Sequence, residues 1–201
     1  MMSKTEERRA ALRLRLIESA ERRIAADGLG ALRARDLADD AGCALGAIYN
    51  AFDDMDELIL RVNARTLARL GAAALGAGLG PPRERLKRLA LAYADFAIRE
   101  TKLWSALFEH RMAADRDTPD WYRNENAVLI QQIAEPVAAL RPSLDGHELL
   151  IRARTLFSAV HGVVAISIEE RFVGVAPADL RAELSRFVDV LVAGIEATPD
   201  R

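Results

Sequence analysis

Apolar residues recur at steps of three and four along most of the 201-residue chain, which is the spacing that lines one face of a helix. The first such stripe runs through Leu12, Leu16, Ala20 and Ile24. No segment has the sustained alternation of apolar and polar residues that is typical of a strand. The pattern therefore predicts an all-α protein of about nine helices, over residues 8–27, 34–41, 45–52, 56–75, 83–100, 102–113, 120–140, 146–172 and 177–197.

Glycine, proline and acidic residues predict where several of these helices begin and end. Gly28 follows the first helical stretch and suits the left-handed conformation that closes a helix, and Gly42 stops the second. Asp53 and Asp54 precede the fourth helix and offer side-chain acceptors for its first N–H groups. Pro136 lies inside the seventh predicted helix, where its missing N–H should kink or end that helix.

The second and third predicted helices are both short and are joined by a tight turn at Gly42. Ala38 and Ala41 are small enough to let the two helices cross closely, and Leu37 and Ile48 supply apolar contacts between them. This is the geometry of a helix-turn-helix, whose second helix enters the major groove of DNA. On the pattern alone, any helical hairpin within a bundle fits equally well.

A longer motif favours the DNA-binding interpretation. Gly-Ala-Ile-Tyr-Asn-Ala-Phe at residues 46–52 is followed by an acidic turn and by Asp-Glu-Leu at residues 56–58. Over residues 14–60 the sequence resembles the DNA-binding domain of the tetracycline-repressor (TetR) family. The resemblance implies a DNA-binding domain over residues 1–57 and an all-helical ligand-binding and dimerisation domain over residues 58–201.

The resemblance also implies how such a protein works. A homodimeric repressor would release a palindromic double-stranded DNA operator when an unidentified small-molecule effector binds. We expect the last two helices to form the dimer interface through apolar stripes that include Val160, Val164 and Val188. Two-fold symmetry would then place the two reading helices about one DNA turn, ~34 Å, apart.

Candidate DNA contacts follow from the resemblance, position by position. Tyr49 matches a tyrosine whose hydroxyl contacts a phosphate, and core packing is the alternative role for this residue. For Phe52 we expect core packing. Gly46 would allow close approach to DNA, and the apolar side chains beside it can meet thymine methyl groups. The full set of candidate contacts is Arg33, Arg35, Leu45, Gly46, Ala47, Tyr49 and Asn50.

Some residues depart from the family pattern and keep a second interpretation open. Ala44 stands where a Ser or Thr usually caps the reading helix, and Met55 replaces a usual lysine. Residues 1–60 hold nine Lys and Arg against twelve Asp and Glu, whereas DNA affinity depends largely on neutralising phosphates. Residues 1–16 are net positive and would contact DNA or form a solvated tail. The alternative to a repressor is a helical ligand-binding or scaffold protein with a degenerate DNA-binding surface.

Aromatic and polar residues in the C-terminal half suggest a mostly apolar ligand cavity, with ordinary core packing as the alternative for each. Residues 156–162 also resemble the Trp-x-x-x-His-Gly motif of one TetR-type C-terminal domain class, with Phe157 in place of the tryptophan. The candidate ligand-binding residues are Tyr93, Phe96, Trp104, Phe108, Trp121, Tyr122, Asn126, Phe157 and His161.

Several function classes find no support in the sequence. A single cysteine excludes a disulfide framework, and the three histidines do not have the spacing of a metal site. No glycine-rich phosphate loop follows a strand, so we expect neither an enzyme nor a bound cofactor or metal. The longest nearly uncharged stretch, residues 159–168, is half of what a bilayer requires, and no secretory signal precedes the first helix. We therefore expect a cytoplasmic protein without a membrane span.

Overall fold

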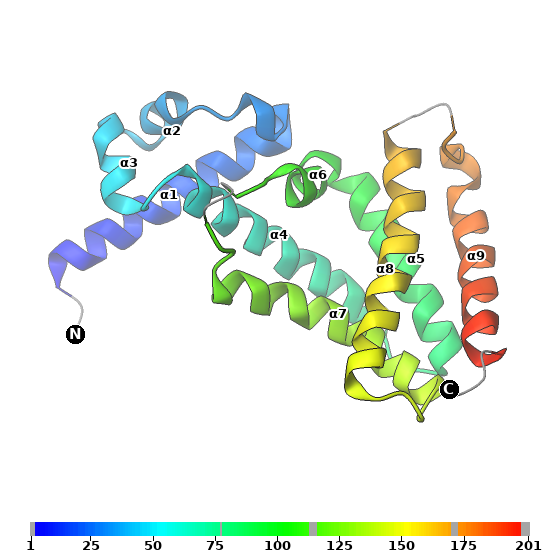
Figure 1. The fold of residues 1–201 in the computed structure, drawn as a ribbon. Coiled ribbons are helices and arrows are strands. Elements are labelled where there is room, and N and C mark those ends of the chain that lie inside the picture. The colour runs from blue at the N-terminus through cyan, green and yellow to red at the C-terminus, as the bar shows by residue number, and fades with distance from the viewer. Residues whose placement is uncertain (1–2, 77, 113–115, 170–172, 198–201) are drawn as a thin grey trace. The chain divides into compact units, whose positions relative to one another are not determined.

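The computed structural model describes residues 3–76, 78–112, 116–169 and 173–197. All regular structure in these ranges is helical, as predicted (Figure 1). One short 3-10 helix, Leu29–Ala31, lies between the first two α-helices. The nine α-helices of the described ranges are α1 (Lys4–Asp27), α2 (Ala34–Ala41), α3 (Leu45–Ala51), α4 (Met55–Gly76), α5 (Pro82–Arg99), α6 (Thr101–Glu109), α7 (Asp120–Leu140), α8 (Gly146–Ile168) and α9 (Pro177–Ala197).

The chain folds into two compact units. The first consists of Met1–Thr66 and Glu100–Tyr122, and the second of Leu67–Arg99 and Arg123–Arg201. Helix α4 contributes to both units, and so does α7. The segment that contains α6 therefore packs with the N-terminal helices, although the sequence interpretation grouped it with the C-terminal domain.

The first unit is built around one apolar core to which five helices contribute, α1, α2, α3, α4 and α6. Leu16 and Ile24 of α1, Leu37 of α2 and Ile48 of α3 are all fully buried. Helix α6 adds Leu103 to the same core. The stripe predicted along the first helix is the face that packs here, and this burial is the main force that holds the short helices α2 and α3 in place.

The second unit packs α5, α8 and α9 together, with α8 and α9 side by side (Figure 1). Leu184 and Val192 of α9 are fully buried. Val160, Val164 and Val188 are at most 9% exposed, so they face the interior of this bundle. Our expectation that these three valines form a dimer interface was wrong, because the chain's own neighbouring helices already cover them.

Three helix ends differ from the prediction by more than one residue. Helix α1 begins at Lys4 because Ser3 and Glu6 form a capping box, so the basic residues at the N-terminus are helical and not a disordered tail. Helix α6 ends at Glu109, and α8 ends at Ile168, where the Ser167 hydroxyl accepts the Val175 N–H at 3.1 Å. The ends expected at residues 113 and 172 lie outside the described residues.

Glycine and proline behave partly as predicted. Gly42 is left-handed, but Gly28 combines a φ of 83° with an extended ψ of 168° and closes α1 differently. Pro136 lies inside α7 and does not end it.

One helix meets the length and composition of a membrane span, which the uncharged stretch alone did not suggest. Helix α8 has an 18-residue window of mean hydropathy 1.5, and only 11% of that window is buried within the chain. Such a helix is weak support for a membrane segment. It does show that much of the apolar surface of α8 has no cover among the described residues.

Candidate DNA-binding surface and ligand cavity

The turn between α2 and α3 is closed by Gly42, with φ 63° and ψ 45°. Its N–H group donates to the carbonyls of Ala38 and Asp39, which the end of a helix would otherwise leave unpaired. A Cβ at Gly42 would meet no atom within 4 Å, so glycine is required here by backbone conformation and not by space. The predicted helix-turn-helix is confirmed.

Helix α3 has one buried and one solvent-facing side. Ile48 and Ala51 are buried, whereas Leu45 is 47% and Tyr49 is 53% exposed. The exposed pair is one helical turn apart, so both side chains leave the same face. Gly46 and Asn50 are also exposed and follow them on that side, and Ala47 is half-buried. Tyr49 therefore lies outside the core, unlike Phe52, which is 1% exposed.

The two arginines before this helix differ in their surroundings. The Arg33 guanidinium donates to the carbonyls of Gly30 at 2.8 Å and Leu32 at 2.9 Å, so it is partly used in fixing its own loop. Arg35 is exposed and forms no ion pair with any residue in the described ranges. Ala44 is the N-cap residue of α3. Its methyl group cannot accept a hydrogen bond, so the first N–H groups of α3 have no side-chain cap.

Arg13 of α1 holds the far end of α3. Its guanidinium donates to the Ala51 carbonyl and pairs with Glu57 at 2.6 Å. The guanidinium carbon also lies 4.2 Å from the centre of the Phe52 ring, a cation–π contact. Cations near a helix C-terminus are favoured by its dipole. The sequence did not reveal this role, because nothing distinguishes Arg13 from its basic neighbours.

A second arginine fixes α2 against α1. Arg23 pairs with Asp40 at 2.7 Å and with Asp36 at 3.5 Å, and Ser19 also donates to Asp40. The hydrogen bonds from Arg23 and then Ser19 hold the pKa of the Asp40 carboxyl well below its usual range. Asp36 and Asp40 are therefore both paired within the unit, with Arg23 as their shared partner.

The acidic run before α4 is also used internally. Asp54 accepts the Glu57 N–H at 2.8 Å and thereby caps α4, as predicted, and it also pairs with Arg116. Burial raises the pKa of Glu57, but the Asp53 N–H and Arg13 outweigh it, so the net shift is downward. Asp54 and Glu57 are therefore engaged in contacts within the first unit. No acidic residue lies on α3 itself.

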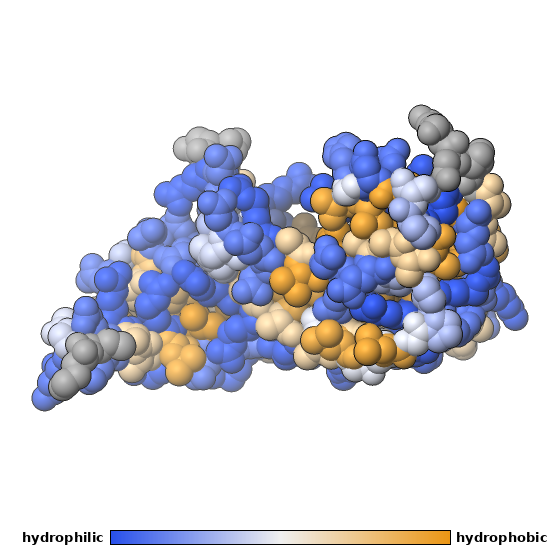
Figure 2. All heavy atoms as spheres, turned by 90° about the horizontal axis from the view of Figure 1, so that it is seen from below, coloured by the Kyte–Doolittle hydropathy of each residue, from blue (hydrophilic) through white to orange (hydrophobic). Residues whose placement is uncertain are grey.

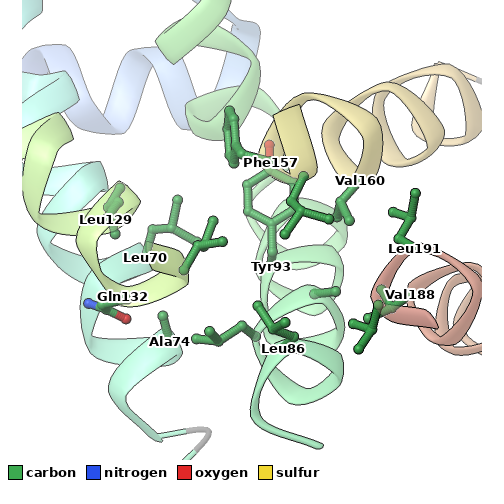
Figure 3. A pocket seen from close by; sticks show the side chains of 15 residues that line it. Leu70, Ala74, Leu86, Tyr93, Leu129, Gln132, Phe157, Val160, Val188 and Leu191 are labelled. Carbon is green, nitrogen blue, oxygen red and sulfur yellow. The ribbon is translucent and has the colours of Figure 1, made fainter. Parts of the chain in front are cut away.

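The second unit contains a cavity of about 80 Å³ (Figure 3). Five helices contribute to its wall, which is apolar apart from Gln132 and the Tyr93 hydroxyl. Helix α4 supplies Leu70 and Ala74 to this wall. The lining residues are Leu70, Ala74, Leu86, Leu89, Ala90, Tyr93, Leu129, Gln132, Ile133, Leu156, Phe157, Val160, Val188, Leu191 and Val192.

Three of the predicted ligand-binding residues form a cluster at this wall. The Tyr93 hydroxyl shares a hydrogen bond with His161 Nδ1 at 2.7 Å. Phe157 stacks on the His161 ring with 5.7 Å between ring centres, and it meets Tyr93 edge-on at 5.5 Å. Burial lowers the pKa of His161, against the opposing charge of Glu169. The imidazole is therefore neutral at pH 7.

The other candidates lie elsewhere. Phe96 is buried beneath Arg99, and Asn126 is exposed on α7. The remaining four belong to the first unit, where the Trp104 and Phe108 rings are 5.3 Å apart, the Trp121 and Tyr122 rings are 5.7 Å apart, and Arg61 lies 4.0 Å above Trp121. The sequence could not assign these aromatic residues to a unit, because a helix stripe does not reveal which neighbour it packs against.

Most lining residues escaped the sequence analysis. Leu70, Gln132 and Val188 lie at the wall, but aliphatic residues that line a cavity have the same helical spacing as those that fill a core. Only Gln132 offered a signal, since it is a polar residue among apolar ones on α7.

A helix-turn-helix with a solvent-facing second helix, joined to a helical bundle that encloses an apolar cavity, defines the class of helical transcriptional regulators. Comparison with known families identifies which one. A family model described as bacterial regulatory proteins, tetR family, matches residues 16–62. A second, described as tetracyclin repressor-like, C-terminal domain, matches residues 86–191, which is more than half of the chain. The chain belongs to the tetR family, as the resemblance predicted.

Solved structures share this fold at low sequence identity. A protein with unknown function from Rhodococcus sp. RHA1 has a TM-score of 0.72 and 22% identity, covering 91% of this chain and 94% of its own. A TetR transcriptional regulator from the same organism has a TM-score of 0.63 and 19% identity, covering 92% and 97%. RolR in complex with resorcinol has a TM-score of 0.67 and 16% identity, covering 98% of each chain. No curated protein matches the sequence.

The protein is thus a TetR-family transcriptional regulator. TetR-family proteins are regulators rather than enzymes, and they bind DNA operators and small-molecule ligands.

Proposed function

We propose that this regulator is a repressor that binds a palindromic operator as a homodimer and releases it when a small molecule enters the cavity. The DNA-binding function is placed in residues 1–57, and ligand binding and dimerisation in residues 58–201. Such a protein acts in the cytoplasm, where its DNA lies. The single observation that carries the proposal is the exposed side of α3. The opposite side of this helix packs in a buried core, and the helix has no acidic residue.

On this proposal, the exposed side of α3 enters the major groove. The Tyr49 hydroxyl and the Asn50 amide would donate to phosphates, and Leu45 and Ala47 would meet thymine methyl groups. Gly46 keeps the helix close to the DNA, and Arg35 is available for a phosphate or base. Arg33 has a smaller role here than the sequence suggested, because it also holds its own loop.

The uncovered side of α8 supports dimerisation. Ile151 is 47% and Ile166 is 39% exposed, and Thr155, Ser158 and Gly162 lie between them at three- and four-residue steps. A Cβ at Gly162 would meet nothing within 4 Å inside the chain, so a second helix has room to approach. Hydrophobic residues gather on the surface of the second unit in the right half of Figure 2. This side replaces the valine stripe as the proposed interface.

Release would act through α4. Its first residues follow the reading helix directly, and its later residues Leu70 and Ala74 line the cavity. A ligand that displaces this wall would move a helix that is continuous with the DNA-binding unit. The shift can be no larger than the ligand's preference for one state, and a 100-fold preference corresponds to about 2.7 kcal/mol. RolR was solved with resorcinol bound, so a protein of this fold takes a small-molecule ligand.

Selection of bound duplexes from a random pool at low salt tests the proposal. We expect a palindrome with half-sites about one turn apart. Tyr49→Phe should weaken binding of the selected operator, since it removes only the hydroxyl. Tyr93→Phe makes the same chemical change in the cavity wall and should leave ligand-free operator binding unchanged. A folded dimer that enriches no sequence would instead indicate the helical scaffold with a degenerate DNA-binding surface.

A further inference from the structure

The first two turns of α1 extend beyond the core of the first unit. Every residue from 3 to 11 is exposed, whereas Leu16, farther along the same helix, is fully buried. Figure 1 shows this end of α1 projecting past α3, with no other helix beside it. The extension therefore contributes nothing to the hydrophobic core, and its side chains can contact another molecule.

The extension is helical because it carries its own N-terminal cap. Ser3 Oγ accepts the Glu6 N–H at 3.2 Å, and the Glu6 carboxylate accepts the Ser3 N–H at 2.6 Å. The hydrogen bond from the Ser3 N–H, and then the Ser3 side chain, hold the pKa of Glu6 below its ordinary value. Since the helix continues into the packed part of α1, the extension needs no separate nucleation. Its direction is thus fixed by the rest of α1.

Three cations on this extension are unpaired within the chain. Lys4, Arg8 and Arg9 are exposed, and none of them forms an ion pair with a residue that the structure describes. Arg13 and Arg23, farther along α1, are paired with acidic residues of the unit instead. An unpaired guanidinium is well suited to a phosphate, which it can bind through two parallel N–H groups.

Helix geometry places the two arginines of the extension just beyond the end of α3. Arg13 donates to the carbonyl of Ala51, the last residue of α3, so α1 passes that end of the helix at Arg13. Arg9 lies four residues earlier on the same face of α1, about 6 Å along the axis. Arg8 is its neighbour in the same turn. Both arginines therefore lie in the unit that carries α3, one turn past its last residue.

The same end of α3 carries two of the proposed phosphate contacts. Tyr49 and Asn50 lie in its last turn, and both are exposed. The major groove is only about 12 Å wide, so a cation just beyond a helix in the groove lies close to the backbone that borders it. Glu7 shares a face of α1 with Leu14, which is 50% exposed and points away from the core, so this carboxylate lies on the far side from Arg9.

We propose that the exposed start of α1 is a second DNA contact, in which Arg8 and Arg9 bind phosphates of the duplex that flanks each half-site. This inference rests on the proposed function, because it extends the same DNA interface beyond α3. The contact neutralises phosphates and reads no bases, so it adds affinity without selecting a sequence. It also supplies the positive charge that a DNA-binding unit with an acidic excess needs.

The salt dependence of operator binding by the full chain tests the proposal. Each phosphate contact contributes about 0.9 to the slope of log affinity against log salt, and a dimer holds two copies of each arginine. The double variant Arg8→Gln, Arg9→Gln should therefore have a slope shallower by about 3 to 4 between about 50 and about 200 mM salt. At the lower concentration it should bind the selected operator at least about tenfold more weakly. Arg8→Lys with Arg9→Lys keeps both charges and should keep most of the slope.

The length of the duplex locates the contact. The wild type should bind more tightly when the operator is flanked on each side by about 10 further base pairs, one helical turn, and the sequence of these flanks should not matter. The double glutamine variant should gain nothing from the flanks. Arg22→Gln is the matched control, because Arg22 is an exposed arginine near the other end of α1, and this variant should keep the flank effect. All variants should melt like the wild type, since the changed side chains are exposed.

An unchanged salt slope or an unchanged flank effect in the double glutamine variant would overturn the proposal and leave the proposed function intact. Loss of the flank effect in Arg22→Gln as well would mean that overall charge matters and not the position of Arg8 and Arg9, which also overturns it. If the pool enriches no operator, the slopes are compared on an unrelated duplex, because phosphate contacts form on any sequence. A shallower slope of the double variant there would uphold the phosphate contact and contradict the sequence-specific repressor.

Discussion

The helix-turn-helix and the cavity are built from the same helical elements but are held together differently. In the first unit, Arg13 and Arg23 fasten α3 and α2 to α1 through charged hydrogen bonds over a filled core. In the second, five helices surround an apolar cavity. A surface that reads DNA must hold its side chains at fixed positions, whereas a binding cavity must leave space for a ligand.

This difference predicts unequal costs for the same truncation in the two units. Phe52→Ala should lower the free energy of unfolding by about 4 kcal/mol, because Phe52 is fully buried and its loss leaves a void. Phe157→Ala should cost only about 1–2 kcal/mol, since Phe157 is half-buried and already borders a cavity. Urea denaturation followed by circular dichroism measures both. Equal losses would mean that the cavity wall is packed as tightly as the core.

A smaller loss of unfolding free energy is expected when the charged contacts of one arginine are removed. Arg13→Met keeps an unbranched side chain but removes the hydrogen bonds to Ala51 and Glu57, so unfolding should become about 2 kcal/mol easier. Operator affinity should fall as well, because the end of α3 loses its anchor. Arg9→Met changes an exposed arginine on the same helix and serves as the control for stability. If both variants unfold alike, Arg13 is not an anchor.

The missing cap of α3 gives an opportunity to strengthen the first unit. Ala44→Thr places a hydroxyl where it can accept the first N–H groups of α3, and should add about 1 kcal/mol to the free energy of unfolding. Ala44→Val has the same shape without the acceptor and should bring no gain. A thermal melt of the two variants beside the wild type decides between capping and a simple change of volume.

The smallest expected effect is a dependence of stability on pH that differs between the two units. The pKa of Asp40 is lowered from 3.8 and that of Glu57 from 4.5, so their stabilisation is complete above these values and is lost as the pH falls below them. Burial lowers the pKa of His161 in the second unit and of His110 in the first from 6.5, so protonation of the unfolded chain begins to destabilise both units below about pH 6.5.

Urea midpoints at pH 7, 5.5 and 3.5 measure these two steps. Arg23→Met should flatten the acid step between pH 5.5 and 3.5. His161→Gln should reduce the step between pH 7 and 5.5 but not remove it, because His110 contributes to the same step. A midpoint that rises as the pH falls would contradict the sign of both shifts.

Much of the fold could be predicted because its signals are local. The end of α2 follows from Gly42, the start of α9 from Pro177, and α7 lies between Pro119 and Pro142. The start of α1 also has a local signal, because Ser3 and Glu6 have capping-box spacing.

The cavity was harder to predict than the reading helix, because its parts are distant in sequence. Tyr93, Phe157 and His161 were expected at a ligand site, and the structure brings these three together. Trp104 and Trp121 were grouped with them on chemistry alone, yet they pack in the first unit. Helical periodicity gives the buried face of a helix but not the identity of the helix it meets.

Helix α4 has a consequence for how this protein can change during evolution. It is one uninterrupted helix that begins in the reading unit and ends at the cavity wall, so the angle and the distance between any two of its residues are fixed by helix geometry. Inserting one residue between Leu70 and Ala74 would turn one of them by about 100° relative to the other and move it by about 1.5 Å, so the two could no longer both line the cavity. Descendants of this gene can therefore vary the loop that begins at Gly78 in length, but must keep the length of α4 and change its side chains instead.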